Sequence, residues 1–171
     1  MGTTKSGRYL NTKGSAKSVS DYALVHSSEG TFTIPSKKND ELRLKSGGHG
    51  EKAIQLLNKY KIEYNIIKTY PNRVRVGNVP NHKEQSKRQK TNQVWFPKTW
   101  SNKDIKRAGE HVSSLKANRK VKNGTIIYGN YKGVRVGVIK TNGIIGTIFP
   151  DSNQSKVIRR KKWTLKKDLK M

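Results

Sequence analysis

The fold of this chain is constrained most tightly by two apolar runs, "KGVRVGVIK" and "GIIGTIFP", which Asn142-Gly143 joins. Asn-Gly is a strong hairpin signal, because both residues tolerate the positive φ that a two-residue turn requires. Val134, Val136 and Val138 alternate with other residues, so they should share one face of a strand and point into the core. With the preceding run "TIIYG", these segments predict a three-stranded antiparallel meander.

Two helices and one further hairpin are predicted before this meander. Apolar residues at helical spacing indicate a helix over 50–60. The β-like runs "EYNIIKTY" and "RVRVGNV" flank Pro71-Asn72, a pair that suits a tight turn. Ser101 and Asp104 have the spacing of a capping box, and the apolar stripe of a second helix follows them: Ile105, Ala108, Val112 and Leu115. The order helix, hairpin, helix, meander predicts an α+β fold with an antiparallel sheet.

The remaining segments are expected to flank one folded core. Residues 1–45 form a basic lead-in, in which "YALVHSSEGTFTIPS" could add short strands to the sheet, with His26 in a strand. Residues 46–151 should form the core, and residues 152–171 a basic C-terminal tail. No apolar run approaches the ~20 residues of a membrane span, and the first residues lack the apolar core of a signal peptide. The chain is therefore expected to be soluble.

Charge points to the class of partner. Lysine and arginine outnumber the acidic residues 37 to 11, which gives a formal net charge of +26. So many positive charges repel one another in a compact fold, so a polyanionic partner is expected. Because the basic residues are spread along the chain, they suit the phosphate backbone of a nucleic acid, although an idle basic surface is the alternative. A membrane partner is not expected, since no segment combines this charge with an apolar helical face.

Few kinds of catalytic chemistry fit the reactive residues of this chain. It has no cysteine, and its four histidines are too far apart in sequence to indicate a metal site, so neither a metal nor a cofactor is expected. Metal-free cleavage of RNA needs a base for the 2′-hydroxyl, an acid for the leaving 5′-oxygen and a cation for the charge on phosphorus. Two histidines and a lysine can supply all three.

His49 is the best-placed candidate for this chemistry. It lies among Gly47, Gly48 and Gly50 at the start of the first predicted helix, where free N–H groups and the helix dipole favour an anion. Small residues there would let a phosphate approach the backbone. The alternative is a glycine-rich helix boundary with an incidental histidine.

The other candidates also have ordinary interpretations. His82 is either a second acid/base group in a phosphate-binding loop or part of a solvated run of charges. Thr147 is either a β-branched strand residue or a hydroxyl for a phosphate or a base edge. His111 lies on the flank of the second helix's apolar stripe and is expected to be partly packed, whereas His26 is left without a role.

Taken together, the segments resemble the bacterial EndoU nucleases, which occur as C-terminal toxin domains of polymorphic, contact-dependent and LXG-type toxins. The resemblance covers about Ser46 to Asp151. It consists of "SGGHG" opening a helix, a histidine and lysine before "WFPKTWS", the helix "NKDIKRAGEHV", and the closing "YKGVRVGVIKTNGIIGTIFP". It implies a compact RNase-toxin fold, with N-terminal helices packed on a curved antiparallel sheet that ends in the meander.

The resemblance also implies an active site of two histidines, a lysine and a threonine. By motif these are His49, His82, Lys87 and Thr147, with Lys87 preferred over Lys83 and Lys90 by its distance from "WFP". His49 is the preferred base and His82 the preferred acid. Phe149 stands where many members have tyrosine, so it keeps a stacking surface without the hydroxyl. The expected substrate contacts are Gly48, Lys83, Lys90 and Phe149.

We therefore expect a toxin endoribonuclease that cleaves RNA, with tRNA a candidate, and leaves 2′,3′-cyclic phosphate and 5′-hydroxyl ends. An acidic immunity protein is the expected protein partner, and the domain should be secreted or delivered to act in the cytoplasm of a target cell. The main alternative is a non-catalytic basic RNA-binding module. A metal-dependent DNase is a further alternative, while a deaminase lacks the zinc signature that its chemistry needs.

Overall fold

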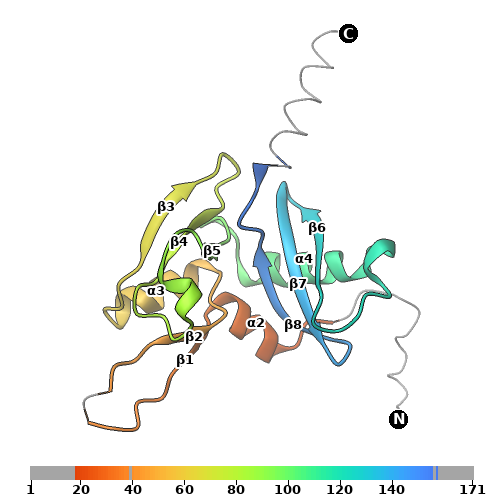
Figure 1. Ribbon diagram of the computed structural model, residues 1–171. Helices are drawn as coiled ribbons and strands as arrows, with labels where there is room; N and C mark the ends of the chain where they lie inside the picture. The colour runs from red at the N-terminus through yellow and green to blue at the C-terminus, as the bar shows by residue number, and fades with distance from the viewer. Residues whose placement is uncertain (1–17, 39, 156, 158–171) are drawn as a thin grey trace.

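The computed structural model describes residues 18–38, 40–155 and 157 (Figure 1). Its helices are α2 (Asp21–Ser28), α3 (Glu51–Lys59) and α4 (Asn102–Ser114), with two 3₁₀ turns, η1 (Gln85–Arg88) and η2 (Lys116–Asn118). Its strands are β1 (Thr31–Phe32), β2 (Leu44–Ser46), β3 (Asn65–Thr69), β4 (Arg75–Asn78), β5 (Gln93–Trp95), β6 (Ile126–Tyr131), β7 (Val134–Thr141) and β8 (Ile144–Pro150). The predicted α+β class is confirmed. Most of the predicted tail and the first part of the lead-in lie outside the described residues.

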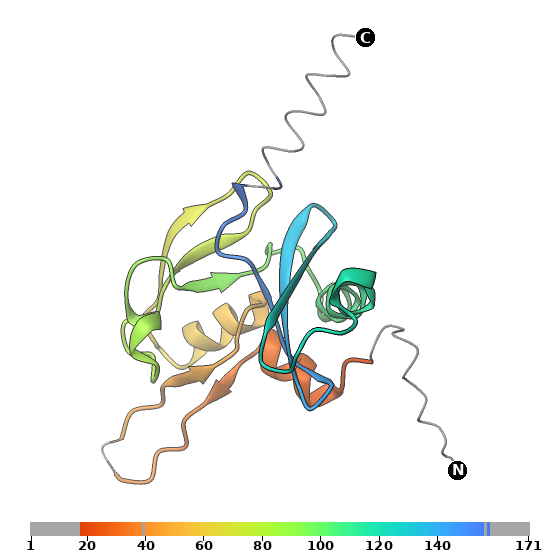
Figure 2. The same ribbon diagram turned by 45° about the vertical axis from the view of Figure 1, so that its right-hand side comes forward.

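The described strands form three small antiparallel sheets, β1-β2, β3-β4-β5 and β6-β7-β8. The last is the predicted meander, and Asn142 and Gly143 have the positive φ values of 53° and 76° that its turn requires. Val134, Val136 and Val138 are all buried, as their alternation predicts. β8 forms the edge of this sheet that lies toward β5, which is visible in the two views of Figures 1 and 2.

The two predicted helices are also confirmed. α4 begins at a capping box in which the Ser101 hydroxyl accepts from the Asp104 N–H and the Asp104 carboxylate accepts from the Ser101 N–H. Ile105, Ala108 and Val112 of its stripe are buried against the meander, while Leu115 is half-buried at the end of the helix. α3 buries Ala53, Ile54 and Leu57. β3 and β4 pair as the predicted hairpin around Pro71-Asn72.

The prediction of strands before residue 36 is wrong for residues 21–28, which form α2. Ser20 caps this helix, because its hydroxyl accepts a hydrogen bond of 3.1 Å from the Ala23 N–H, and Asp21 suits the positive end of the helix dipole. The strand expected there is limited to Thr31–Phe32. His26 therefore lies in the last turn of a helix, and the Ser20-Asp21 start signal could have indicated this.

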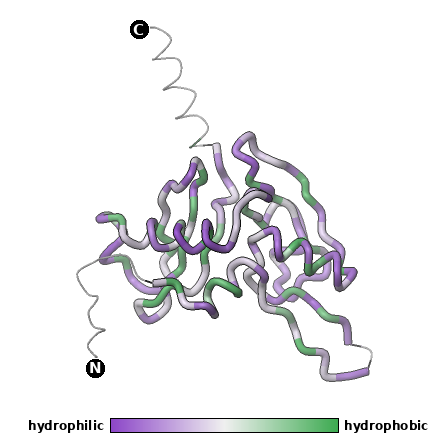
Figure 3. The backbone as a smooth tube through the Cα atoms, turned by 180° about the vertical axis from the view of Figure 1, so that it is seen from behind, coloured by the Kyte–Doolittle hydropathy of each residue, from purple (hydrophilic) through white to green (hydrophobic). Residues whose placement is uncertain are grey.

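The β3-β4-β5 sheet separates two hydrophobic clusters, because side chains alternate across it. Val94 and Phe96 join a large cluster with α4 and the meander, whereas Trp95 packs on the other side with Leu57 of α3. Figure 3 shows hydrophobic residues in short segments interspersed with hydrophilic ones along the chain. Among the described residues, no helix has the length and apolar character needed to cross a membrane.

Candidate active site

A cavity of about 280 Å³ lies where α2, β5 and the loop 82–87 meet the outer face of the meander. This is the face opposite the buried Val136 and Val138. Three of the four histidines line it, and so do residues from the last strand. The candidate side chains that line it are His26, His49, His82, Lys87, Thr147 and Phe149. Tertiary contact thus brings together residues from almost the whole described length of the chain.

The glycine-rich segment is placed by α2. The N–H groups of Gly48, His49 and Gly50 donate to the carbonyls of His26, Ser27 and Ser28 at 3.0, 2.6 and 3.0 Å. Gly47 and Gly48 have φ values of +68° and +75°, and a Cβ on Gly47 would lie 2.1 Å from the His26 carbonyl oxygen. Glycine is required here because the two backbones touch.

The glycines let this backbone pack against α2, whereas the sequence predicted that they would let a phosphate approach it. The N–H groups of Gly48, His49 and Gly50 are bonded to α2 and are therefore not free to receive an anion. Gly48 is buried and does not line the cavity, whereas Gly47 does. What the segment achieves instead is to hold His49 beside His26.

The His49 ring is fixed in one tautomer by its partner. Its Nδ1 lies 2.8 Å from the carbonyl oxygen of Val94. Since a carbonyl can only accept, Nδ1 carries the proton and Nε2 of the neutral ring keeps a free lone pair. Burial lowers the pKa of His49 to about 3, and the charge of Lys87 acts in the same direction. His49 is therefore neutral at pH 7, and Nε2 is the ring atom that can accept a proton.

The His82 ring is held in the opposite tautomer. The Glu84 N–H donates to its Nδ1 at 2.8 Å, so Nε2 carries the proton of the neutral ring. Burial lowers the pKa of His82 to about 4, and Lys87 adds to this effect. Protonating Nδ1 would break the bond from Glu84. His82 is thus suited to donate a hydrogen bond through Nε2 rather than to carry a full positive charge.

His26 is the functional candidate that the sequence pattern did not identify. It is half-buried, and its Nδ1 lies 2.7 Å from the Thr31 hydroxyl, which can accept or donate. Burial lowers the pKa of His26. A protonated His26 could still satisfy Nδ1–H on Thr31 and present Nε2–H to the cavity. Of the three cavity histidines, His26 and His49 can therefore become imidazolium without losing a hydrogen bond.

The three candidate lysines differ in their burial and in their position relative to the cavity. Lys87 is half-buried and lines the cavity, and its Nζ donates to the Asn92 carbonyl at 2.9 Å. Burial lowers the pKa of Lys87. Lys83 and Lys90 are exposed and do not line the cavity. Of the three, Lys87 is accordingly the lysine that lines the cavity.

Thr147 and Phe149 reach the cavity from the outer face of β8. Phe149 pairs with Gly137 of β7, and a Cβ on Gly137 would lie 2.7 Å from the phenyl ring. The bare glycine thus lets the ring lie against the sheet, with its centroid 5.9 Å from that of His49. His111 is exposed on α4, 5.6 Å from the Tyr131 ring, and does not line the cavity. Among the described residues, no group of three or more His, Cys, Asp or Glu could hold a metal ion.

Comparison with known proteins places the chain in a family. A family model described as bacterial EndoU nuclease matches residues 20–152, a range that includes all of α2 to β8 and every cavity residue. No curated protein and no solved structure matches the chain.

Proposed function

Since the chain belongs to the bacterial EndoU nuclease family, we propose that this nuclease is a toxin endoribonuclease that cleaves RNA by metal-independent transesterification. The observation that carries the proposal is the complementary hydrogen bonding of the histidines in one cavity. His49 Nε2 has a free lone pair, and His26 and His82 can each present an N–H. A base and an acid are the two proton-transfer groups that the reaction needs.

His49 acts as the base in this proposal. Its Nε2 takes the proton of the ribose 2′-hydroxyl while the 2′-oxygen attacks phosphorus. The Val94 carbonyl stabilises the resulting imidazolium, because it already accepts from Nδ1. The P–O5′ bond then breaks, which leaves a 2′,3′-cyclic phosphate on one fragment.

The acid that protonates the leaving 5′-oxygen is His26 in this proposal, in place of the His82 expected from the sequence. The reason is the Glu84 N–H, which occupies Nδ1 of His82 and opposes its protonation. Thr31 imposes no such restriction on His26. His82 instead donates its Nε2–H to a non-bridging phosphate oxygen, and the Lys87 ammonium stabilises the charge that develops there.

The remaining residues hold the RNA. Thr147 offers a hydroxyl beside the scissile bond, and Phe149 offers a ring on which a base can stack. Lys83 and Lys90 are exposed near the cavity loop and would contact phosphates farther along the strand. Gly48 supports His49 through its backbone rather than by touching substrate.

The test is incubation of the purified protein with total tRNA in EDTA, followed by analysis of the fragment ends. We expect cyclic phosphate and 5′-hydroxyl ends.

His49→Gln and His26→Gln should each lower kcat by about 10²–10⁴-fold. His82→Gln keeps a hydrogen-bond donor, so it should lower kcat by about tenfold or less. Intact RNA with the wild-type protein would refute the nuclease. A kcat that falls as far in His82→Gln as in His49→Gln, with His26→Gln near wild type, would return the acid role to His82.

The alternative, a non-catalytic RNA-binding module, gives a different result in the same assay, because His26→Gln and His49→Gln would change binding slightly and nothing else.

In a toxin context the partner is an acidic immunity protein that covers the basic face, and the domain acts after delivery into the cytoplasm of a target cell. The net charge of +26 supports both an RNA substrate and an acidic partner.

A further inference from the structure

Helix α2 turns only part of its apolar surface toward the core. It buries Ala23 together with Ser27 and Ser28, while Tyr22 is 78% exposed and Val25 is 45% exposed. A surface helix normally turns its apolar residues toward the core. An exposed aromatic side chain beside a cavity of polar, reactive residues suggests a surface for binding a ligand.

The exposed tyrosine is aligned with a cavity histidine. Tyr22 lies four residues before His26, on the same side of α2. Their rings are nearly parallel, at 12°, with centroids 6.4 Å apart. His26 is held from its edge by Thr31 and from its backbone by Gly48, so its ring cannot easily turn away. The pair therefore presents one fixed ring and one exposed ring.

We infer that Tyr22 and His26 form a stacking subsite for the base of a nucleotide that flanks the scissile phosphate. A base between two rings needs two stacking layers of about 3.4 Å each, or about 6.8 Å between the ring planes. The centroids lie 6.4 Å apart, so the planes of these nearly parallel rings are no farther apart than that, and the exposed Tyr22 side chain must move outward to admit a base. The face of the His26 ring that is turned toward Tyr22 binds the base, while its Nε2 edge remains directed to the reaction.

The ligand of this subsite is single-stranded RNA. A base can enter between two rings only when it is unstacked from its neighbours, as in loops and single strands. Stacking of this kind tolerates any base, because every base has an aromatic face. The high positive charge of the protein supplies the attraction for the connecting phosphates. The inference rests on the proposed ribonuclease function and extends it by one nucleotide.

The experiment separates binding from cleavage. Binding is measured with a five-nucleotide RNA whose scissile nucleotide lacks the 2′-hydroxyl, so that it cannot be cut. We expect Tyr22→Ala to weaken binding by about 5- to 100-fold and Tyr22→Phe to bind like wild type, because the ring and not the hydroxyl stacks. Tyr60→Ala is the matched control, since Tyr60 is also exposed, at 42%, and its ring lies against Phe32 rather than against a cavity histidine.

Kinetics with two cleavable substrates give a second readout. Tyr22→Ala should raise KM for the five-nucleotide RNA while leaving kcat nearly unchanged, and it should not affect a dinucleotide that spans only the scissile bond. Equal binding by Tyr22→Ala and wild type, or an equal loss in Tyr60→Ala, would overturn the subsite. If wild type binds the analogue but cuts no RNA, the ribonuclease proposal fails, and the binding of Tyr22→Ala still decides the subsite.

Discussion

At the scale of single residues, the chemical role of each cavity histidine follows from the atom that faces its Nδ1. That atom is a carbonyl oxygen for His49, an amide N–H for His82 and a hydroxyl for His26. A carbonyl favours a ring that can gain a proton at Nε2, an amide N–H opposes protonation, and a hydroxyl allows either state. Three identical side chains thus differ, through their neighbours, in where they can hold a proton.

This assignment predicts the pH dependence of cleavage. The acid works only when protonated and the base only when neutral, so kcat/KM should fall about tenfold per pH unit above the pKa of His26. Burial places the pKa of His26 below its ordinary 6.5, while that of His49, at about 3, sets the acidic limb. Initial rates on a short RNA at constant ionic strength, from about pH 4 to about pH 8, would measure this. A rate that rises with pH across this range would contradict the assignment.

At the scale of structural elements, the segment from Gly47 to Gly50 and the end of α2 act as one unit. Three backbone hydrogen bonds join them, and they carry His49 and His26 respectively. The unit depends on the absence of a side chain at Gly47, where the backbones meet. Its function is therefore to set the distance between two histidines that are far apart in sequence.

Gly47→Ala should disrupt this unit. The new Cβ would collide with the His26 carbonyl, and the backbone has a positive φ of +68°. Gly133→Ala is the control, because it has a similar φ of +75° and no atom within 4 Å of the added Cβ. We expect the control to lower the free energy of unfolding by about 1 kcal/mol, and Gly47→Ala to lower it by at least about 2 kcal/mol more. Urea denaturation would measure both, and equal losses would show that the collision is relieved without cost.

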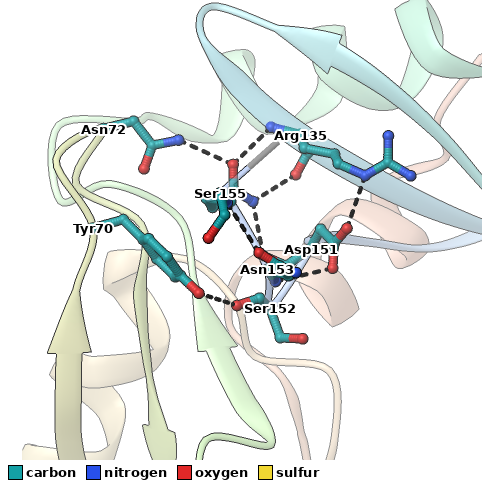
Figure 4. A network of polar contacts seen from close by, with 8 residues as sticks. Tyr70, Asn72, Arg135, Asp151, Ser152, Asn153 and Ser155 are labelled. Carbon is teal, nitrogen blue, oxygen red and sulfur yellow. Dashed lines mark hydrogen bonds and ion pairs between the residues drawn. The ribbon is translucent and has the colours of Figure 1, made fainter. Parts of the chain in front are cut away.

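At the scale of the whole molecule, a polar network joins the β3-β4 turn to the end of the meander (Figure 4). The Tyr70 hydroxyl donates to the Ser152 carbonyl at 2.9 Å, and Asn72 donates to Gln154 at 2.9 Å. Gln154 is fully buried and bonds the backbone of Arg135 through both ends of its amide. The network fixes the β3-β4-β5 sheet relative to the meander, and side chains from both sheets line the cavity.

Gln154→Ala should loosen this connection. It would leave the Arg135 N–H without its buried acceptor, and we expect the free energy of unfolding to fall by about 2 to 4 kcal/mol. Activity should decline as well, because the two walls of the cavity would no longer be held together. Ser152→Ala is the control, since it keeps the carbonyl that accepts from Tyr70 and changes an exposed side chain. Thermal unfolding followed by circular dichroism would measure both, and equal stability of the two variants would argue against the network.

The elements were predictable from the sequence where their signals are local. The Asn142-Gly143 turn, the alternating valines and the capping box at Ser101 each depend on residues a few positions apart, and all three are confirmed. The start of α2 had a local signal too, in Ser20-Asp21, but a β-like composition concealed it. His49, His82, Lys87, Thr147 and Phe149 were predicted as site residues, and the structure brings them to one cavity.

By itself, the sequence determined the order of helices and hairpins, the positive charge and the family resemblance, because propensity, periodicity and composition are properties of short segments. Only the tertiary structure decided that His26 joins His49 and that Lys87, rather than Lys83 or Lys90, lines the cavity. It also decided the tautomer of His49, whose partner Val94 is 45 residues away. The physical reason is that proximity, burial and hydrogen-bond partners arise from contacts between distant segments, which no local pattern encodes.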